Sequence, residues 1–324
     1  MGGGHWDDDA YTSSSSSRRS AGVDDFAYSK SARSVHASLD PKRISGKPFG
    51  KLESRDSLEH PDSNAIIVAF DVTGSNISRA VEAQKALPAL MNLLPKYIPD
   101  PQIAVAANDD IKAAIGRSGP VQISEFESDN RIDEHIRNIW LVGDGGGNNG
   151  ESYDLILYAA ARKTVMDCFE KRGRKGYLFL YADEPFMNEV DKREVADVFG
   201  DSIKKDIPVT DMIAEVREAF HVFVLWPVGG YDDAYQQFLE LFGKESVLIL
   251  QHPNKICELI GVTIGVNEQK ISAAQAVDDL VAVGVSKKMA HDISESLVPL
   301  SKNKAVAKAT GGLPRTSRGG AARL

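Results

Sequence analysis

Short continuous apolar runs alternate with longer amphipathic stretches between residues 65 and 264, and this alternation restricts the fold more than any other feature of the sequence. An apolar run of four to eight residues is typical of a strand buried on both faces, whereas apolar residues at helical spacing are typical of a helix that covers a sheet. Strands that alternate with helices predict a mainly parallel sheet with helices on both faces. We therefore expect a doubly wound α/β fold with a sheet of about six strands.

The third apolar segment differs from the others, because polar and apolar residues alternate in it after the Gly119-Pro120 turn. This pattern indicates an exposed edge strand, which we expect to be antiparallel. The expected strands are residues 65–70, 102–107, 121–126, 177–182, 221–226 and 247–250. The expected helices between and after them are residues 77–97, 151–171, 191–199, 209–219, 231–242 and 254–264.

Composition divides the chain into four regions. Residues 1–63 are rich in Ser, Gly and charged side chains without a sustained period, so we expect a disordered or peripheral extension. Its aromatic residues leave three possibilities open, namely docking on the domain, docking on a neighbour, or a free tail. Residues 64–266 form the predicted domain, residues 267–300 an expected helical hairpin, and residues 301–324 an expected flexible basic tail. The aromatic residues of the extension are Trp6, Tyr11, Phe26 and Tyr28.

The formal net charge of −8 argues against a chain that binds nucleic acid over its whole surface, since phosphate binding needs basic surface. We leave nucleic-acid contact open only for residues 302–324, which contain six basic residues and no acidic residue. The first residues lack the basic and apolar regions of a signal peptide, and no apolar run approaches the roughly 20 residues that span a bilayer. We therefore expect a cytoplasmic protein that does not cross a membrane.

A polar pentapeptide, Asp71-Val-Thr-Gly-Ser75, follows the first expected strand and precedes a helix. Asp71, Thr73 and Ser75 supply one carboxylate and two hydroxyls, which are hard oxygen ligands suited to Mg²⁺, Mn²⁺ or Ca²⁺. In parallel sheets, ligands bind at the carboxyl ends of the strands, where Asp109 and Asp183 also lie. The sequence therefore predicts a divalent metal site at this edge of the sheet.

With these strand ends, the region from about residue 64 to 265 resembles a von Willebrand factor A domain. The metal-ion-dependent adhesion motif of that family, Asp-x-Ser-x-Ser, corresponds to Asp71-x-Thr73-x-Ser75, and the later aspartate of the family corresponds to Asp183. The family's threonine has no direct match, because a glycine-rich loop, residues 143–150, stands in its place.

That loop resembles the one in a bacterial or phage-type intracellular branch of the family. The branch implies Glu151, or less readily Ser152, at the threonine position, and an acid after the second strand, which is Asp109. The resemblance thus implies a Mg²⁺ ion, or Mn²⁺ or Ca²⁺, held by Asp71, Thr73, Ser75, Glu151, Asp183 and Asp109.

The resemblance also implies a function in protein–protein recognition. A partner protein would present an Asp or Glu whose carboxylate supplies a remaining ligand of the metal ion. Many intracellular relatives act as adaptors beside larger machines. We therefore expect an adaptor or assembly protein, and we identify no catalytic constellation in the sequence that would indicate an enzyme.

Three other interpretations remain open. A phosphohydrolase of the haloacid dehalogenase type also has an aspartate after its first strand, but the second aspartate that acts as its acid and base is replaced here by Thr73. A structural or assembly protein with a vestigial metal loop fits as well, because Thr73 and Ser75 are common helix-capping residues. Finally, Gly145-x-Gly147-x-x-Gly150 has the spacing of a dinucleotide-binding loop, although that fingerprint belongs to a first strand–helix unit.

Overall fold

The computed structural model describes residues 4–47, 49–73, 76, 78–111, 119–141, 150–230 and 232–310. Its central sheet consists of β2 (Asn64–Asp71), β3 (Pro101–Asn108), β4 (Val121–Ile123), β6 (Gly176–Tyr181), β9 (Phe220–Pro227) and β10 (Val247–Leu250). The six strands have the order β10-β9-β6-β2-β3-β4. All neighbouring pairs are parallel except β3 and β4, which are antiparallel. The prediction of a mostly parallel sheet with one antiparallel edge strand is confirmed. The expectation that this strand is exposed is wrong, because all three residues of β4 are buried.

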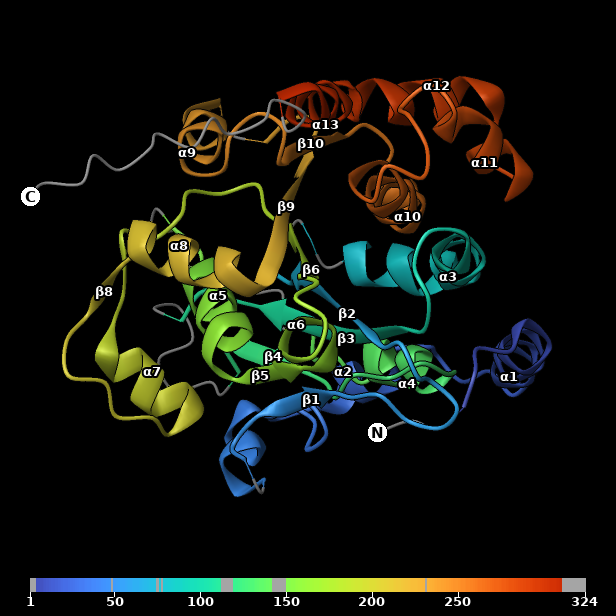
Figure 1. Cartoon of the computed structure of the whole chain (residues 1–324). Helices are drawn as coiled ribbons and strands as arrows, with labels where there is room; N and C mark the ends of the chain where they lie inside the picture. Colours follow the sequence, from blue (N-terminus) through green and yellow to red (C-terminus); the bar gives the residue numbers. More distant parts are fainter. Residues whose placement is uncertain are drawn as a thin grey trace, which may run out of the picture.

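Helices cover both faces of this sheet (Figure 1). Because side chains alternate along a strand, β2 places Ile66, Val68 and Phe70 in one hydrophobic core and its intervening residues in the other. The first core is closed by α3 (Ser78–Leu93), α4 (Arg131–Arg137) and α10 (Ile256–Asn267), the last preceded by the 3₁₀ turn η4 (Pro253–Lys255). The second core is closed by α5 (Tyr153–Arg162), α6 (Asp167–Glu170), α7 (Lys192–Phe199), α8 (Val209–Ala219) and α9 (Asp232–Phe242).

The prediction of one continuous helix over residues 151–171 is wrong. The chain leaves α5 after Arg162, forms the short strand β5 (Thr164–Met166), and only then enters α6. β5 pairs in parallel with β1 (Leu52–Ser54), and its β-branched residues suit that extended backbone. Tertiary pairing with a strand more than a hundred residues away therefore overrides the local helical pattern.

Two smaller differences have local causes. The expected helix 77–97 becomes α3 followed by a 3₁₀ turn, η3 (Leu94–Lys96), which contains Pro95 and thus lacks a backbone donor there. A two-stranded antiparallel pair that the sequence pattern did not predict, β7 (Glu189–Val190) with β8 (Ile207–Pro208), precedes α8.

The described part of the N-terminal extension lies against the domain and is partly helical rather than disordered. It contains α1 (Asp8–Ser20), α2 (Ala27–Ser31) and the 3₁₀ helix η1 (Pro41–Gly46). Phe26 is 5% exposed and belongs to the first core, against which Trp6 also packs. The Tyr11 hydroxyl donates to the carbonyl of Gln84 in α3 at 2.9 Å. Of the possibilities left open for the aromatic residues, the structure shows docking on the domain for Trp6, Tyr11 and Phe26, whereas Tyr28 contacts Ser34 and His36 within the extension.

The C-terminal helices lie together with α10 at one end of the molecule (Figure 1). α11 (Ala276–Ala282) and α12 (Lys287–Ser296) form the expected pair, and α13 (Val298–Thr310) extends into the segment expected to be a flexible tail. Leu280, Ile293 and Leu300 belong to the same core as α3 and α10, so these helices pack on the domain. None of the helices in the described ranges combines the length and the hydropathy needed to cross a bilayer.

Candidate metal centre

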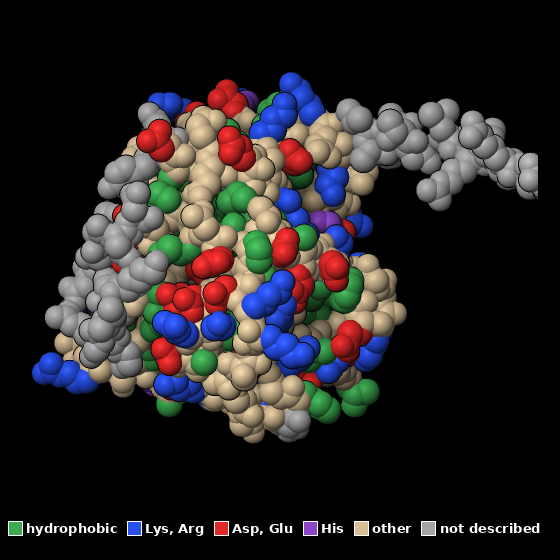
Figure 2. Space-filling model, turned by 90° about the vertical axis from the view of Figure 1, so that its left-hand side faces the viewer, with side chains coloured by type: hydrophobic (Ala, Val, Ile, Leu, Met, Phe, Trp, Pro, Cys, Tyr) green, Lys and Arg blue, Asp and Glu red, His purple; other side chains and the backbone are tan. Residues whose placement is uncertain are grey.

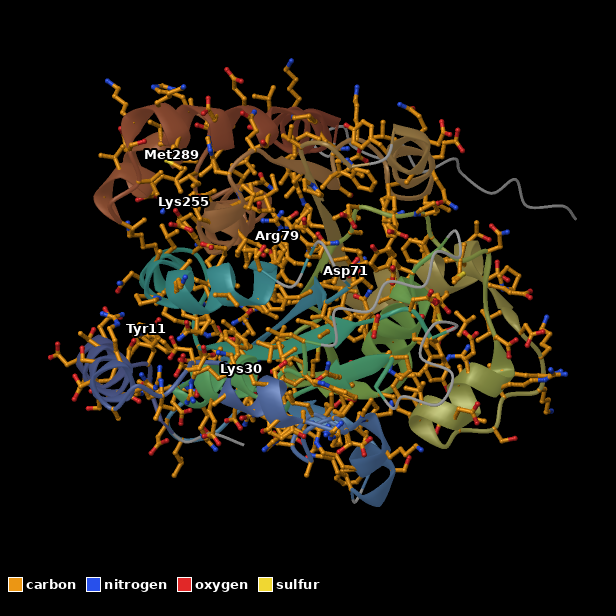
Figure 3. The ribbon with its side chains drawn as sticks, turned by 180° about the vertical axis from the view of Figure 1, so that it is seen from behind. Tyr11, Lys30, Asp71, Arg79, Lys255 and Met289 are labelled. Atoms are coloured by element: carbon orange, nitrogen blue, oxygen red, sulfur yellow. The ribbon has the colours of Figure 1, made fainter. Side chains whose placement is uncertain are left out.

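Asp71 ends β2 at the edge of the sheet where the parallel strands have their carboxyl ends, and Figure 3 labels it near the middle of the molecule. Its side chain is fully buried. One carboxylate oxygen, Oδ1, accepts hydrogen bonds from the Thr73 backbone N–H at 2.8 Å and from the Thr73 hydroxyl at 2.6 Å. The other oxygen, Oδ2, accepts from the Tyr153 hydroxyl at 3.0 Å. The carboxylate is therefore oriented both by its own loop and by the first residue of α5.

Asp183 follows the neighbouring strand β6 and is connected to the same loop. The Asn76 amide donates to Asp183 Oδ1 at 2.9 Å, and the Tyr181 hydroxyl donates to Asn76 Oδ1 at 3.2 Å. Arg79, at the beginning of α3, donates to the Tyr181 hydroxyl at 2.9 Å and lies near Asp71 in Figure 3. These bonds hold the loop after β2 and the loop after β6 together.

Asn108 and Asp109 supply the third strand end. Asn108 lies directly opposite Asp71 in the register of β2 and β3 and is 1% exposed. Neither its side-chain oxygen nor its nitrogen has a hydrogen-bond partner among the described residues. Asp109 is also buried, and its Oδ1 accepts from the backbone N–H of Asp110 at 2.8 Å. A buried amide without a partner is costly, so its position beside Asp71 indicates a place for a further polar group.

Glu151 comes to the same edge from the far end of the glycine-rich loop. Its backbone N–H donates to the carbonyl of Pro185 at 3.1 Å, and it bridges to Phe186 in parallel, so it is fixed beside the loop that follows β6. The side chain is 2% exposed, and Oε2 has no hydrogen-bond partner among the described residues.

Burial and mutual repulsion raise the pKa values of these carboxyl groups. Burial raises the pKa of Asp71 to about 6, and the charge of Asp183 contributes in the same direction. Burial, together with the charge of Asp71, raises the pKa of Asp109 to about 7. For Glu151, burial and the charges of Asp71 and Glu184 raise the pKa to about 10. The acids therefore share one electrostatic environment, in which a bound cation would favour their charged forms.

Five of the six predicted ligands lie in the described part of the chain, and the structure brings them to one edge of the sheet. They are Asp71, Thr73, Asp109, Glu151 and Asp183. Ser75 lies outside the described residues. Among the described residues, no group of three or more His, Cys, Asp and Glu side chains is placed so that it could hold a metal ion by itself. A metal ion at this edge would therefore need other ligands in addition to these carboxylates.

The sequence reasoning missed the polar residues that orient these acids. Tyr153 and Tyr181 stand within apolar stretches, so they have the signature of core residues, and Asn76 resembles an ordinary loop residue. The one available signal was position, because Tyr181 is the last residue of its strand, next to the predicted ligand edge.

The dinucleotide interpretation lacks its structural context. Residues 142–149, which hold most of the glycine spacing, lie outside the described residues. Residues 139–141, which precede the loop, are not in a strand, whereas the fingerprint requires a strand directly before it.

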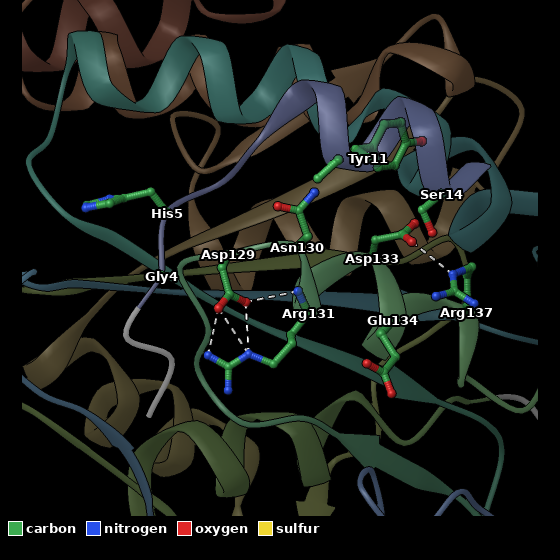
Figure 4. A pocket seen from close by; sticks show the side chains of 11 residues that line it. Gly4, His5, Tyr11, Ser14, Asp129, Asn130, Arg131, Asp133, Glu134 and Arg137 are labelled. Atoms are coloured by element: carbon green, nitrogen blue, oxygen red, sulfur yellow. Dashed lines mark hydrogen bonds and ion pairs between the residues drawn. The ribbon is translucent and has the colours of Figure 1, made fainter. Parts of the chain in front are cut away.

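A cavity of about 540 Å³ lies between the N-terminal segment and α4, away from these acids (Figure 4). Both arginines of its lining pair with acids of the same lining: Arg131 donates to Asp129 at 2.8 Å, and Arg137 donates to Asp133 at 2.9 Å. Figure 2 views the side on which α7 and α8 lie, and acidic and basic side chains are interspersed there.

No family model matches the sequence, and no curated protein matches it. Solved structures similar to this chain include the pilus adhesin SpaC of Lactobacillus rhamnosus GG in its open conformation, with a TM-score of 0.44, 12% identity, and coverage of 67% of this chain and 31% of the adhesin. Proximal thread matrix protein 1 of the mussel byssus has a TM-score of 0.40 at 13% identity, covering 62% and 47%. A von Willebrand factor type A protein from Catenulispora acidiphila has a TM-score of 0.37 at 12% identity, covering 63% and 42%. The chain spans less than half of each of these structures.

Proposed function

We propose that this protein is a recognition module that binds a divalent cation, Mg²⁺ in the first instance, at the Asp71-x-Thr73-x-Ser75 loop and captures a carboxylate of a partner protein. The observation that carries the proposal is the position of Asp71, Asp109 and Asp183 at three adjacent strand ends, with the buried Glu151 within range of the charges of Asp71 and Asp109. Two buried side chains there, Asn108 and Glu151, have polar atoms without a partner among the described residues.

The donor set fits a hard cation. Asp71, Thr73 and Ser75 would hold the ion directly or through water, and Glu151, Asp183 and Asp109 would complete the shell. The ion would supply a Lewis-acidic position for the carboxylate of a partner. The residues of this chain would orient the ligands: Tyr153 and Thr73 hold the Asp71 carboxylate, and Asn76 holds the Asp183 carboxylate.

Recognition accounts for the chemistry of the loop better than phosphoryl transfer does. Thr73 stands where the phosphohydrolase needs its second aspartate, and its hydroxyl donates to Asp71 at 2.6 Å. Tyr153 is a fully buried phenol whose pKa is raised far above its ordinary value by burial and by neighbouring acids, so it acts as a hydrogen-bond donor and not as a base.

The test of metal binding is a titration of the full chain with Mn²⁺ and Mg²⁺ by calorimetry, with melting temperature as a second readout. Asp71→Asn is the variant, because it keeps the shape of the side chain and removes its charge. Asp211→Asn, in the exposed first turn of α8, is the matched control. We expect single-site binding in the parent and in Asp211→Asn, and affinity reduced about tenfold or more in Asp71→Asn.

Absence of any Mg²⁺ or Mn²⁺ effect in the parent would favour the vestigial-loop interpretation. Hydrolysis of a phosphate ester that is lost in Asp71→Asn would favour the enzyme. Partner capture is tested by affinity isolation from the native host with and without chelator, using the parent and Asp71→Asn as baits. A specific partner should be lost both with chelator and with Asp71→Asn, and its Asp or Glu residues can then be substituted one by one.

A further inference from the structure

A second cavity, of about 270 Å³, lies where β6, β9 and β10 begin, and therefore at the amino ends of the parallel strands. Lys175 directly precedes β6, His221 is the second residue of β9, and Ser246 directly precedes β10. The parallel direction of these strands places this cavity at the other edge of the sheet from Asp71. Its basic lining residues are Lys175, Arg217, His221 and Lys304.

These four side chains come from separate elements of the fold. Lys175 belongs to the loop before β6, Arg217 to the last turn of α8, and Lys304 to α13. Arg217 donates to the carbonyl of Phe242 at 2.7 Å, and its guanidinium lies 5.4 Å from the centre of the Phe242 ring. Lys175 donates to the carbonyl of Arg217. Backbone carbonyls around the cavity thus hold the two side chains in position, and the charge of Glu245 also acts on Arg217.

The cavity keeps an excess of positive charge. Glu245 is the acid among its described lining residues, and Glu268 interacts with Lys304 from outside the lining. Burial and the charges of Lys304 and Lys175 lower the pKa of His221 to about 4. Burial also lowers the pKa of Lys304, and the charge of Lys175 adds to the effect. Mutual repulsion among partly buried cations is relieved when an anion enters between them.

One wall of the cavity is apolar and aromatic. Phe220, Phe223 and Phe242 line it beside the basic residues, and Leu300 of α13 adds an aliphatic contact. A volume slightly below the roughly 300 Å³ of small drug-sized pockets suits a ligand with an anionic group and a short body. A phosphate group matches the basic side because it carries close to two negative charges and several strong acceptor oxygens.

We propose that this cavity is a binding site for a small phosphomonoester, with the phosphate held by Lys175, Arg217 and Lys304 and the organic part against Phe223 and Phe242. Such a ligand connects α13 to the edge of the sheet at which β6 and β9 begin, and so stabilises the docking of the C-terminal helix. The site is independent of the metal centre, which lies at the other edge.

The experiment is a titration of the full chain with inorganic phosphate and with phenyl phosphate at constant ionic strength, followed by calorimetry and by the histidine ring resonances, which are assigned with His221→Gln. Lys304→Gln is the variant. Lys302→Gln removes the same charge from the exposed side of the same helix and is the matched control. We expect phenyl phosphate to bind more tightly than phosphate, with affinity reduced about tenfold in Lys304→Gln and unchanged in Lys302→Gln.

If Lys304→Gln and Lys302→Gln change the affinity equally, a general effect of net charge explains the binding, and the proposed site is contradicted. Equal affinities for phosphate and phenyl phosphate would overturn the role of the aromatic wall. If Lys304→Gln does not fold, the titration of the parent protein still tests the proposal. A phosphomonoester bound in this cavity must shift the His221 resonances. Unshifted resonances at saturating ligand would contradict the proposal.

Discussion

The hydroxyl of Tyr153 donates to Asp71 Oδ2 across 3.0 Å, and both side chains are fully buried. These residues are far apart in the sequence, and the bond joins the carboxyl end of β2 to the beginning of α5. The same hydroxyl accepts from the backbone N–H of Asp183 at 3.4 Å. A single phenol therefore contacts both Asp71, the last residue of β2, and Asp183, which follows the neighbouring strand β6.

Removal of that hydroxyl should destabilise the protein and disturb the Asp71 carboxylate. We expect Tyr153→Phe to lower the free energy of unfolding by about 1–3 kcal/mol, because a buried carboxylate loses a donor. Urea denaturation measures this effect. Tyr235→Phe, a partly exposed tyrosine of α9, is the control and should change stability by less than about 0.5 kcal/mol. Equal effects of the two substitutions would contradict the special role of Tyr153.

His221 should make stability depend on pH. Its folded-state pKa of about 4 is below the ordinary value of 6.5, so between these pH values the unfolded chain binds more protons than the folded one. The free energy of unfolding should therefore rise with pH across this window, by up to about 1.4 kcal/mol per pH unit. The contribution of His221 to this rise should be complete above pH 6.5.

The difference between the parent and His221→Gln isolates this contribution. Asp71 and Asp109, whose pKa values are raised, act in the opposite direction in both proteins and cancel in the difference. Denaturation at a series of pH values measures the difference. A difference that stays constant between pH 4 and 6.5 would show that His221 does not titrate as its surroundings indicate.

The contact between α3 and α10 depends on the absence of a side chain at Gly261. A Cβ at this position would lie 2.8 Å from Leu93 Cδ1 and 2.9 Å from Leu93 Cβ. We expect Gly261→Ala to destabilise the protein by about 1–3 kcal/mol, although alanine is the better helix former, because the two helices must move apart. Thermal denaturation measures the loss.

A double-mutant cycle with Leu93→Ala tests the cause. Leu93→Ala alone should also destabilise, because it leaves a cavity, but the double variant should be more stable than the sum of the two effects predicts. Because alanine keeps the Cβ of residue 93, simple additivity of the two losses would mean that the contact with Leu93 Cδ1 does not contribute to the cost of Gly261→Ala.

The N-terminal segment should unfold together with the domain. Phe26 is 5% exposed and lies in the first core, so Phe26→Ala should cost about 3 kcal/mol of stability. Phe49→Ala is the matched control, because Phe49 is 70% exposed and should change stability by less than about 0.5 kcal/mol. Hydrogen exchange of the sheet amides reports the same comparison. A neutral Phe26→Ala would show that the segment is only loosely attached.

The fold was largely predictable because its signal is local. The apolar run before Asp71 has the composition of a doubly buried strand, and the stripe that begins near Ala80 has the period of a helix, so neither needs a distant partner to be recognised. The interruption of the expected helix 151–171 at Thr164 was not predictable, because β5 forms only by pairing with the distant strand β1. The alternation toward Phe126 likewise indicated an edge strand. The continuous strand covers Val121–Ile123, and pairing with β3 returns at a bridge between Glu127 and Ile103.

The candidate site was predictable in part for the same reason. Strand ends can be read from the sequence, and the rule that they meet at one edge places Asp71, Asp109 and Asp183 together. The partners that orient these acids, Tyr153 and Asn76, follow no such rule, since their roles depend on distances between loops.

The sequence by itself determined the alternation of strands and helices and therefore the sheet, its direction and the edge at which the acids gather, because hydrophobic periodicity is a property of neighbouring residues. Only the tertiary structure decided that Tyr153 bonds to Asp71, that Asn108 is buried without a partner among the described residues, and that Lys175, Arg217 and Lys304 meet around one cavity. Burial, hydrogen-bond distance and electrostatic repulsion act between residues that only chain folding brings together.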